Sequence, residues 1–205
     1  PGGTIDALAG MTLTAEPHKI RAFLGFMLTS AFSGFCMFAY IADSSYILQQ
    51  MLGMSPLRFS IVFASNALLS TVLALVNVRL IGRFEPRPLI TFGHVLSLLG
   101  VVILSLSVFV FNVPTIPVLI GFALIMAATA FIFGNAGARA LAESREHAGT
   151  ASAVQGLVQA TAMATASPLA TSGGGTSAIP MILVMILGTL GAWVSFFLIA
   201  RPKAT

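Results

Sequence analysis

The chain has 205 residues, of which 57% are hydrophobic and only 8% are charged, with a formal net charge of +4. A soluble domain carries about 25% charged residues, so this composition excludes an ordinary water-soluble protein. A net positive charge could indicate a nucleic-acid partner, but here the basic residues flank apolar segments, as expected from membrane topology and contact with anionic lipid. We therefore expect membrane lipids, and no nucleic acid, as partners.

Short polar turns divide the chain from residue 20 to residue 200 into six apolar segments. Each is close to the about 20 residues that an α-helix needs to cross a bilayer, and lipid offers backbone groups no partners outside their own helix. The sequence therefore predicts an all-α integral membrane protein, a six-helix transmembrane bundle over residues 19–203. The expected helices cover residues 20–41, 57–80, 89–111, 118–138, 149–171 and 179–200.

Basic residues concentrate in the regions that lie on one side of the membrane if there are six spans. The opposite side carries only Arg58. Because basic residues mark the cytoplasmic face, we expect both termini to be cytoplasmic. The basic residues on that side are Lys19, Arg21, Arg79, Arg83, Arg87, Arg139, Arg145, Arg201 and Lys203.

Polar residues within the expected helices recur at helical spacing on three of them, the first, the second and the fifth. Asn and Gln gain nothing from facing lipid, so these stripes indicate faces turned toward protein or a cavity. Hydrogen bonding between helices is the simpler explanation for a single Ser or Thr. The stripes are Thr29, Ser33, Cys36 and Tyr40; Asn66, Ser70 and Asn77; and Ser152, Gln155, Gln159 and Met163.

From these stripes we predict a substrate path bordered by polar and aromatic side chains, because Met and aromatic surfaces can repack around varied apolar ligands. The predicted path residues are Phe35, Phe38, Tyr40, Asn66, Gln155 and Gln159. We further predict that three arginines form a cytoplasmic gate by binding carbonyl groups at helix ends or carboxylates of neighbouring helices. These are Arg79, Arg83 and Arg87.

No pattern in the chain is typical of an enzyme or of a cofactor site. There is no Gly-x-Ser-x-Gly or His-Glu-x-x-His motif and no His, Cys and carboxylate spacing typical of metal ligands. No acid lies at mid-membrane depth, Asp43 being at the end of the first expected helix, and His94 is expected to be a packing residue. We expect no bond chemistry, no metal and no cofactor.

Four pieces of sequence, in order, resemble drug/proton antiporters of the bicyclomycin-resistance (Bcr/CflA) branch of the major facilitator superfamily. The first, residues 38–49 (FAYIADSSYILQ) with 53–56 (GMSP) and 59–67 (FSIVFASNA), is similar to that family's seventh and eighth helices. The others are the loop 77–87 (NVRLIGRFEPR), the helix end 134–136 (GNA) and the helix start 149–159 (GTASAVQGLVQ). The family's usual Pro near Ser44 is absent, and Glu85 with Pro86 replaces a turn that usually contains Gly.

The resemblance implies that the chain is the carboxy-terminal half of a twelve-helix transporter, residues 1–18 being the tail of a central cytoplasmic loop. The absent amino-terminal half would be a partner and would carry the proton-coupling acids. The implied function is antibiotic resistance through efflux of small lipophilic compounds across the bacterial cytoplasmic membrane, with a proton gradient as the driving force. The expected helices over 89–111 and 179–200 would then face lipid, and the other four the path. Transport of another solute, such as a sugar or metabolite, and a non-transporting membrane scaffold are the alternatives.

Overall fold

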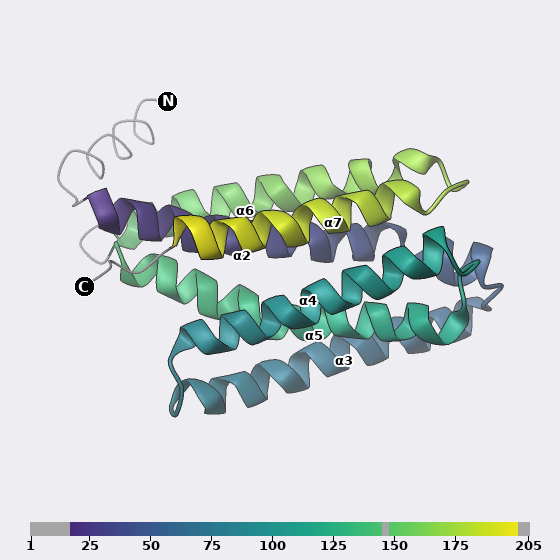
Figure 1. The fold of residues 1–205 in the computed structure, drawn as a ribbon, viewed down its shortest axis with the longest axis horizontal. Helices are drawn as coiled ribbons and strands as arrows, with labels where there is room; N and C mark the ends of the chain where they lie inside the picture. Colours follow the sequence, from purple (N-terminus) through teal and green to yellow (C-terminus); the bar gives the residue numbers. More distant parts are fainter. Residues whose placement is uncertain (1–16, 145–147, 201–205) are drawn as a thin grey trace.

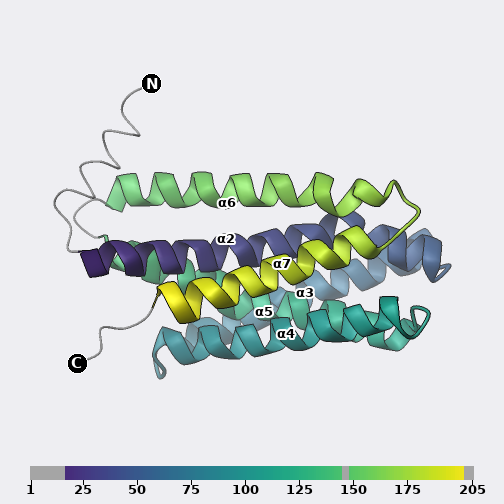
Figure 2. The same ribbon diagram turned by 45° about the horizontal axis from the view of Figure 1, so that its top comes forward.

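The computed structural model describes residues 17–144 and 148–200, which form six long α-helices lying side by side with roughly parallel axes (Figures 1 and 2). No strand occurs among these residues, so the predicted all-α fold class is confirmed. The helices are α2 (Pro17–Ser45), α3 (Pro56–Ile81), α4 (Pro86–Phe109), α5 (Thr115–Ala142), α6 (Ala148–Ala170) and α7 (Ile179–Val194).

Two of the helices continue as π-helix and one as a 3-10 turn. α2 runs into η1 (Tyr46–Met51), α7 into η4 (Ser195–Ile199) and α6 into η3 (Thr171–Gly173). The sequence predicted an end of the first helix at residue 41, because Asp43 suggested the membrane boundary. Asp43 is instead buried within α2, so the helix extends further than expected.

Five helical segments are long and apolar enough to cross a membrane, by length and composition: α2 with η1, α3, α4, α5, and α7 with η4. α6 has 23 residues, a similar length, but contains more Ser, Thr and Gln than the others. The chain is a multi-pass membrane protein.

The helices are arranged around a central pair, α2 and α5, which pack against each other. α6 and α7 pack against α2, whereas α3 and α4 pack against α5 (Figures 1 and 2). The helix contacts therefore repeat between the triplets α2–α4 and α5–α7. In each triplet, the second and third helices pack on the first helix of the other triplet. Since successive helices alternate in direction, the two triplets form an inverted repeat of the kind found in secondary transporters.

Glycines let the outer helices α4 and α7 approach the central pair closely. A side chain at Gly100 of α4 would place its Cβ 3.0 Å from the carbonyl oxygen of Gly121 in α5. A Cβ at Gly188 of α7 would lie 2.9 Å from the backbone nitrogen of Cys36 and 3.0 Å from the carbonyl oxygen of Phe32. Small residues at such crossings favour helix association in lipid through close backbone packing.

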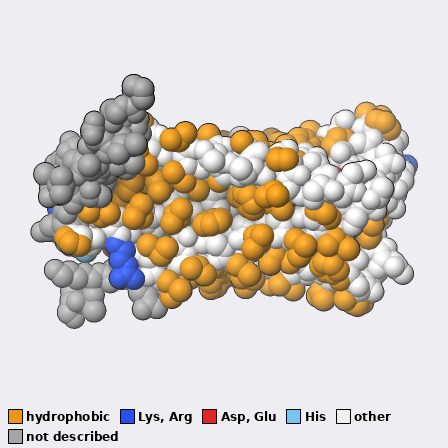
Figure 3. Space-filling view, turned by 90° about the horizontal axis from the view of Figure 1, so that it is seen from above, with side chains coloured by type: hydrophobic (Ala, Val, Ile, Leu, Met, Phe, Trp, Pro, Cys, Tyr) orange, Lys and Arg blue, Asp and Glu red, His pale blue; other side chains and the backbone are white. Residues whose placement is uncertain are grey.

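The outward faces of α4 and α7 are apolar stripes. Their exposed side chains recur three or four residues apart, which places them on one side of each helix. Figure 3 shows hydrophobic side chains along the length of one face of the bundle, with basic side chains visible only near its ends. The exposed large side chains are Phe92, Val95, Leu98, Leu99, Val102, Leu106 and Phe109 of α4, and Ile179, Leu183, Leu187, Leu190, Val194, Phe197 and Leu198 of α7 and η4.

Candidate transport path and basic cluster

Polar pairs between helices connect α3 to the central pair. The amide Nδ2 of Asn66 donates to the Tyr40 hydroxyl of α2 at 3.1 Å, and Nδ2 of Asn135 in α5 donates to Oδ1 of Asn77 at 3.0 Å. Between these two, the hydroxyls of Ser70 and Thr129 of α5 lie 3.3 Å apart. Within α3, whose residues are all described, only Asn66 and Asn77 are buried. Its contact with the bundle is therefore centred on polar groups.

The Tyr40–Asn66 pair is surrounded by aromatic rings. Tyr40 is 1% exposed, and its ring stacks on Phe63 of α3 at a centroid distance of 5.6 Å and contacts Phe122 of α5 at 4.9 Å. Phe59 in turn contacts Phe63 at 5.7 Å. Two of the predicted path residues therefore bind each other in the seam where α2, α3 and α5 meet.

The predicted glutamines of α6 both face the central pair. Nε2 of Gln159 donates to the Ser30 hydroxyl of α2 at 2.8 Å. Gln155 is buried beside Gly137 of α5, where an added Cβ would lie 2.8 Å from its Nε2. Its Oε1 has no hydrogen-bond partner among the residues that the structure describes. Gln155 is thus a buried amide with one unsatisfied acceptor, which costs free energy in an apolar setting.

A half-buried apolar contact lies next to these glutamines, where α2, α5 and α6 meet. A Cβ at Gly34 would lie 2.4 Å from the terminal methyl of Met163 and 3.3 Å from the ring of Phe133. Met163 and Phe133 are both half-buried. Together with Gln159 they form a mixed polar and flexible apolar surface at the edge of the bundle.

The polar stripe of α2 faces the inside of the bundle. The Thr29 hydroxyl donates to the Gly25 carbonyl at 2.7 Å, and the Cys36 sulfur lies 3.7 Å from the hydroxyl of Thr189 in α7. That hydroxyl is also 3.0 Å from Ser97 of α4. Phe35 and Phe38, the two aromatic path residues, are half-buried and pack against the core cluster that contains Tyr40. Most of this stripe therefore connects helices within the bundle.

The exposed side of α6 is made mostly of small and polar residues, with two large apolar side chains, Leu157 and Leu169, among them. The hydroxyls of Thr161 and Thr165 bind carbonyl groups of their own helix. Such a face is typical of close contact between helices in a membrane, rather than of contact with lipid. The exposed residues are Ala148, Gly149, Ser152, Ala153, Gly156, Leu157, Ala160, Thr161, Ala164, Thr165, Pro168 and Leu169.

The three arginines of the predicted gate differ in their surroundings. The guanidinium of Arg87, in the first turn of α4, donates to the carbonyl oxygen of Ala200 and lies over the rings of Phe26 and Phe196, 5.3 Å and 5.5 Å from their centroids. The side chains of Arg79 and Arg83 are exposed and form no hydrogen bond or ion pair within the described part of the chain. Of these three arginines, only Arg87 binds a helix end among the described residues.

Arg139 of α5 packs on the same Phe26 ring as Arg87, although the predicted gate omitted it. We call the arginines at this end of the bundle the basic cluster. Nη2 of Arg139 binds Oε1 of Glu143 at 3.2 Å, and its guanidinium lies 5.4 Å from the centroid of Phe26. Phe26 is therefore contacted by Arg87 from α4 and by Arg139 from α5. The spacing of four residues between Arg139 and Glu143, typical of an ion pair on a helix, is the sequence signal that could have identified this residue.

His94 of α4 is completely buried, as expected for a packing residue. Its ring lies 5.1 Å from Phe196 and 5.8 Å from Trp193 between centroids, and Trp193 Nε1 donates to its backbone carbonyl at 3.3 Å. Neither ring nitrogen has a partner among the described residues. No group of three or more His, Cys, Asp or Glu side chains within 17–144 and 148–200 could hold a metal ion.

The chain is 24% identical over 185 residues to an uncharacterized MFS-type transporter, YdgK, of Bacillus subtilis. This similarity points to the major facilitator superfamily. It covers 90% of the chain but only 46% of YdgK, so the chain spans about half the length of this relative. No family model and no solved structure matches the chain.

A double-mutant cycle tests the polar attachment of α3. For Asn77→Ala and Asn135→Ala, we expect a coupling free energy of about 0.6 kcal/mol, the mean for hydrogen bonds between helices in a membrane. The measurement is unfolding of the purified chain by SDS titration, followed by circular dichroism. Ser65→Ala is the control partner for Asn135→Ala, because the Ser65 hydroxyl is exposed and binds only the Ile61 carbonyl of its own helix. Equal coupling in the two cycles would show that the amide pair does not hold α3.

Proposed function

We propose that this chain is the carboxy-terminal six-helix bundle of a proton-coupled exporter in the bacterial cytoplasmic membrane, in the drug/proton antiporter branch that its sequence resembles. Its cargo is a small lipophilic compound, and both its termini are cytoplasmic. Transport proceeds by alternating access between this bundle and a second one. The proton gradient, rather than a bound cofactor, drives it.

The exposed polar side of α6 is the observation that carries this proposal. A helix surrounded by lipid gains nothing from exposed hydroxyls and small residues, whereas a helix that contacts a second bundle does. The inverted repeat of α2–α4 and α5–α7 supports the same interpretation. The similarity to a transporter about twice as long is also consistent with a second bundle.

The proposed substrate path runs along the side where α2, α5 and α6 meet. Gln159 can exchange its hydrogen bond with Ser30 for one with cargo, and Met163 and Phe133 can repack around apolar groups. The Tyr40–Asn66 pair borders the path on the side of α3, and Phe35 and Phe38 lie nearby. Gln155 borders the path on the side of α5. Lipophilic cargo is favoured because Gln159, Met163 and Phe133 are uncharged and two of the three are apolar.

The proposed gate is the basic cluster at the ends of α3, α4, α5 and η4. Arg87 connects the start of α4 to the end of η4 through the Ala200 carbonyl. Arg79 and Arg83 are exposed and can bind carbonyl groups or carboxylates of the second bundle when the cytoplasmic side closes. Arg139 and Glu143 form a neighbouring pair that such a closure can rearrange.

Efflux measurements test the function directly. In vesicles that contain the chain together with its second six-helix bundle, we expect uncoupler-sensitive export of a lipophilic cationic dye. The chain alone should insert into the membrane but export nothing, because the second bundle that would complete the path is absent. Uncoupler-sensitive export by the chain alone would overturn the proposed division into two bundles. Export of a sugar but not of the dye would favour the alternative solute class.

Cysteine labelling tests the path. In a Cys36→Ala background, we expect Gln159→Cys to react with a membrane-impermeant thiol reagent in the assembled transporter, and a transported dye to slow this reaction severalfold. Leu187→Cys is the matched control, because Leu187 is 61% exposed on the apolar stripe of α7 and should contact only lipid. If dye protects neither position, Gln159 does not border the path.

A further inference from the structure

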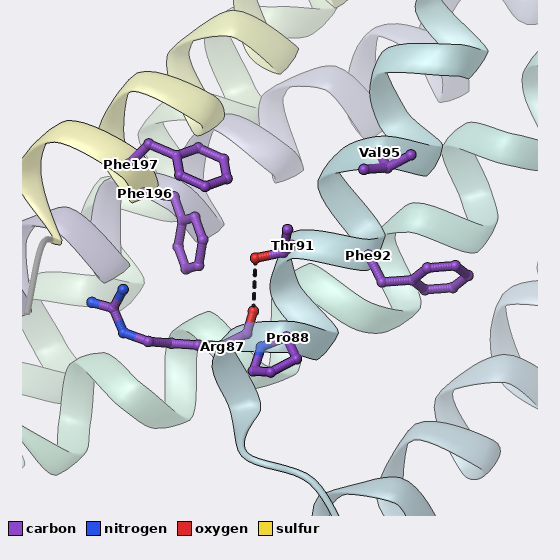
Figure 4. Close-up of a pocket in the computed structure, with 7 residues that line it drawn as sticks. All are labelled: Arg87, Pro88, Thr91, Phe92, Val95, Phe196 and Phe197. Atoms are coloured by element: carbon purple, nitrogen blue, oxygen red, sulfur yellow. Dashed lines mark hydrogen bonds between the residues drawn. The ribbon is translucent and has the colours of Figure 1, made fainter.

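A groove between α4 and η4 opens on the outer side of the bundle near its basic end. It has a volume of about 600 Å³. Figure 4 shows Thr91, Phe92 and Val95 on the α4 side and the rings of Phe196 and Phe197 on the other, with Arg87 at the base of α4. The groove is therefore apolar along its walls and cationic at one end.

The groove faces lipid and not the proposed path. Phe92 and Val95 belong to the exposed apolar stripe of α4. Leu198, next to the groove residue Phe197, belongs to the exposed apolar stripe of α7 and η4. Arg87 is the second residue of α4. An arginine one turn or less from a helix end lies at the depth of lipid headgroups, with acyl chains along the rest of the helix.

Arg87 retains the capacity to bind an anion. A guanidinium has five N–H donors, of which one is used on the Ala200 carbonyl, and its planar group is held between Phe26 and Phe196. Among the described residues it forms no ion pair, and Glu143 binds Arg139 instead. The guanidinium is thus positioned by neutral groups, and the nearby carboxylates of Glu143 and Glu85 act on its charge without forming an ion pair with it.

At the start of α4, the Arg87 side chain is the main group that can bind an anion. The positive end of the helix dipole favours an anion here, but Pro86 and Pro88 have no backbone N–H to offer one. Arg79 lies in the last turn of α3 and Arg83 in the turn that follows it, and both add positive charge, opposed locally by Glu85. An anion at this helix start must therefore bind mainly to the Arg87 guanidinium.

We propose that this groove binds an anionic phospholipid of the leaflet on the basic side of the bundle. Its phosphate binds the Arg87 guanidinium, and an acyl chain lies along Phe92, Val95 and Phe197. Basic pockets between transmembrane helices recognise anionic headgroups in this way. A zwitterionic lipid binds less well because its ammonium group is repelled by the surrounding arginines. Free phosphate offers the same headgroup contact but cannot fill the apolar walls.

Native mass spectrometry of the purified chain in detergent, titrated with phosphatidylglycerol or phosphatidylcholine, tests the site. We expect the wild type to bind phosphatidylglycerol more tightly than phosphatidylcholine because of its net negative charge. Arg87→Gln should weaken phosphatidylglycerol binding about tenfold, because the loss of one charge-assisted hydrogen bond to the phosphate corresponds to about a tenfold change. Inorganic phosphate at millimolar concentration should not displace the lipid.

Two tryptophan variants separate the groove from general lipid contact. Val95→Trp fills the groove without changing charge and should weaken phosphatidylglycerol binding about tenfold. Val102→Trp is the matched control, since Val102 lies two turns further along the same stripe and is similarly exposed, 45% against 43%, and it should bind like the wild type. Equal binding of the two lipids by the wild type, equal behaviour of the two variants, or displacement by phosphate would each overturn the proposal.

Discussion

The structure depends on a constraint set by lipid: helices gain little from burying apolar side chains against one another, so association relies on close packing and on pairing of polar groups. This protein uses both. Glycines bring α4 and α7 against the central pair, and Asn66, Asn77 and Gln159 bind hydroxyl or amide groups on α2 and α5. The outer helices α3 and α6 are thus joined to the centre through hydrogen bonds as well as through apolar packing.

The same constraint explains why the sides of the bundle differ. α4 and α7 present apolar stripes that suit lipid, whereas α6 presents Ser152, Gly156 and Thr161. Under the proposed function, the mostly small and polar face of α6 belongs against a second bundle. The basic cluster around Arg87 and Phe26 lies at one end, where closing and opening would change its contacts.

The sequence predicted the six helices well because each needs about 20 apolar residues between polar turns. The sequence also predicted that Asn66, Asn77 and Gln155 face the bundle, since Asn and Gln are rare where lipid is the neighbour. It could not tell which partner each side chain finds: the stripe of Thr29, Cys36 and Tyr40 has helical spacing, but that spacing is the same for a cavity wall and for an internal contact with α7 and α5. The role of Arg139 beside Phe26 likewise depends on tertiary packing.

The central claim, that the exposed side of α6 is covered by a second bundle, is tested most directly by the oxygen accessibility of spin labels in bilayers. On a Cys36→Ala background, labels at Gly156 and Thr161 of α6 are compared with labels at Leu99 of α4 and Leu187 of α7. In the assembled transporter, the α6 labels should be shielded from oxygen dissolved in lipid, and the α4 and α7 labels should be accessible. High accessibility at Gly156 and Thr161, equal to that at Leu187, would contradict the account.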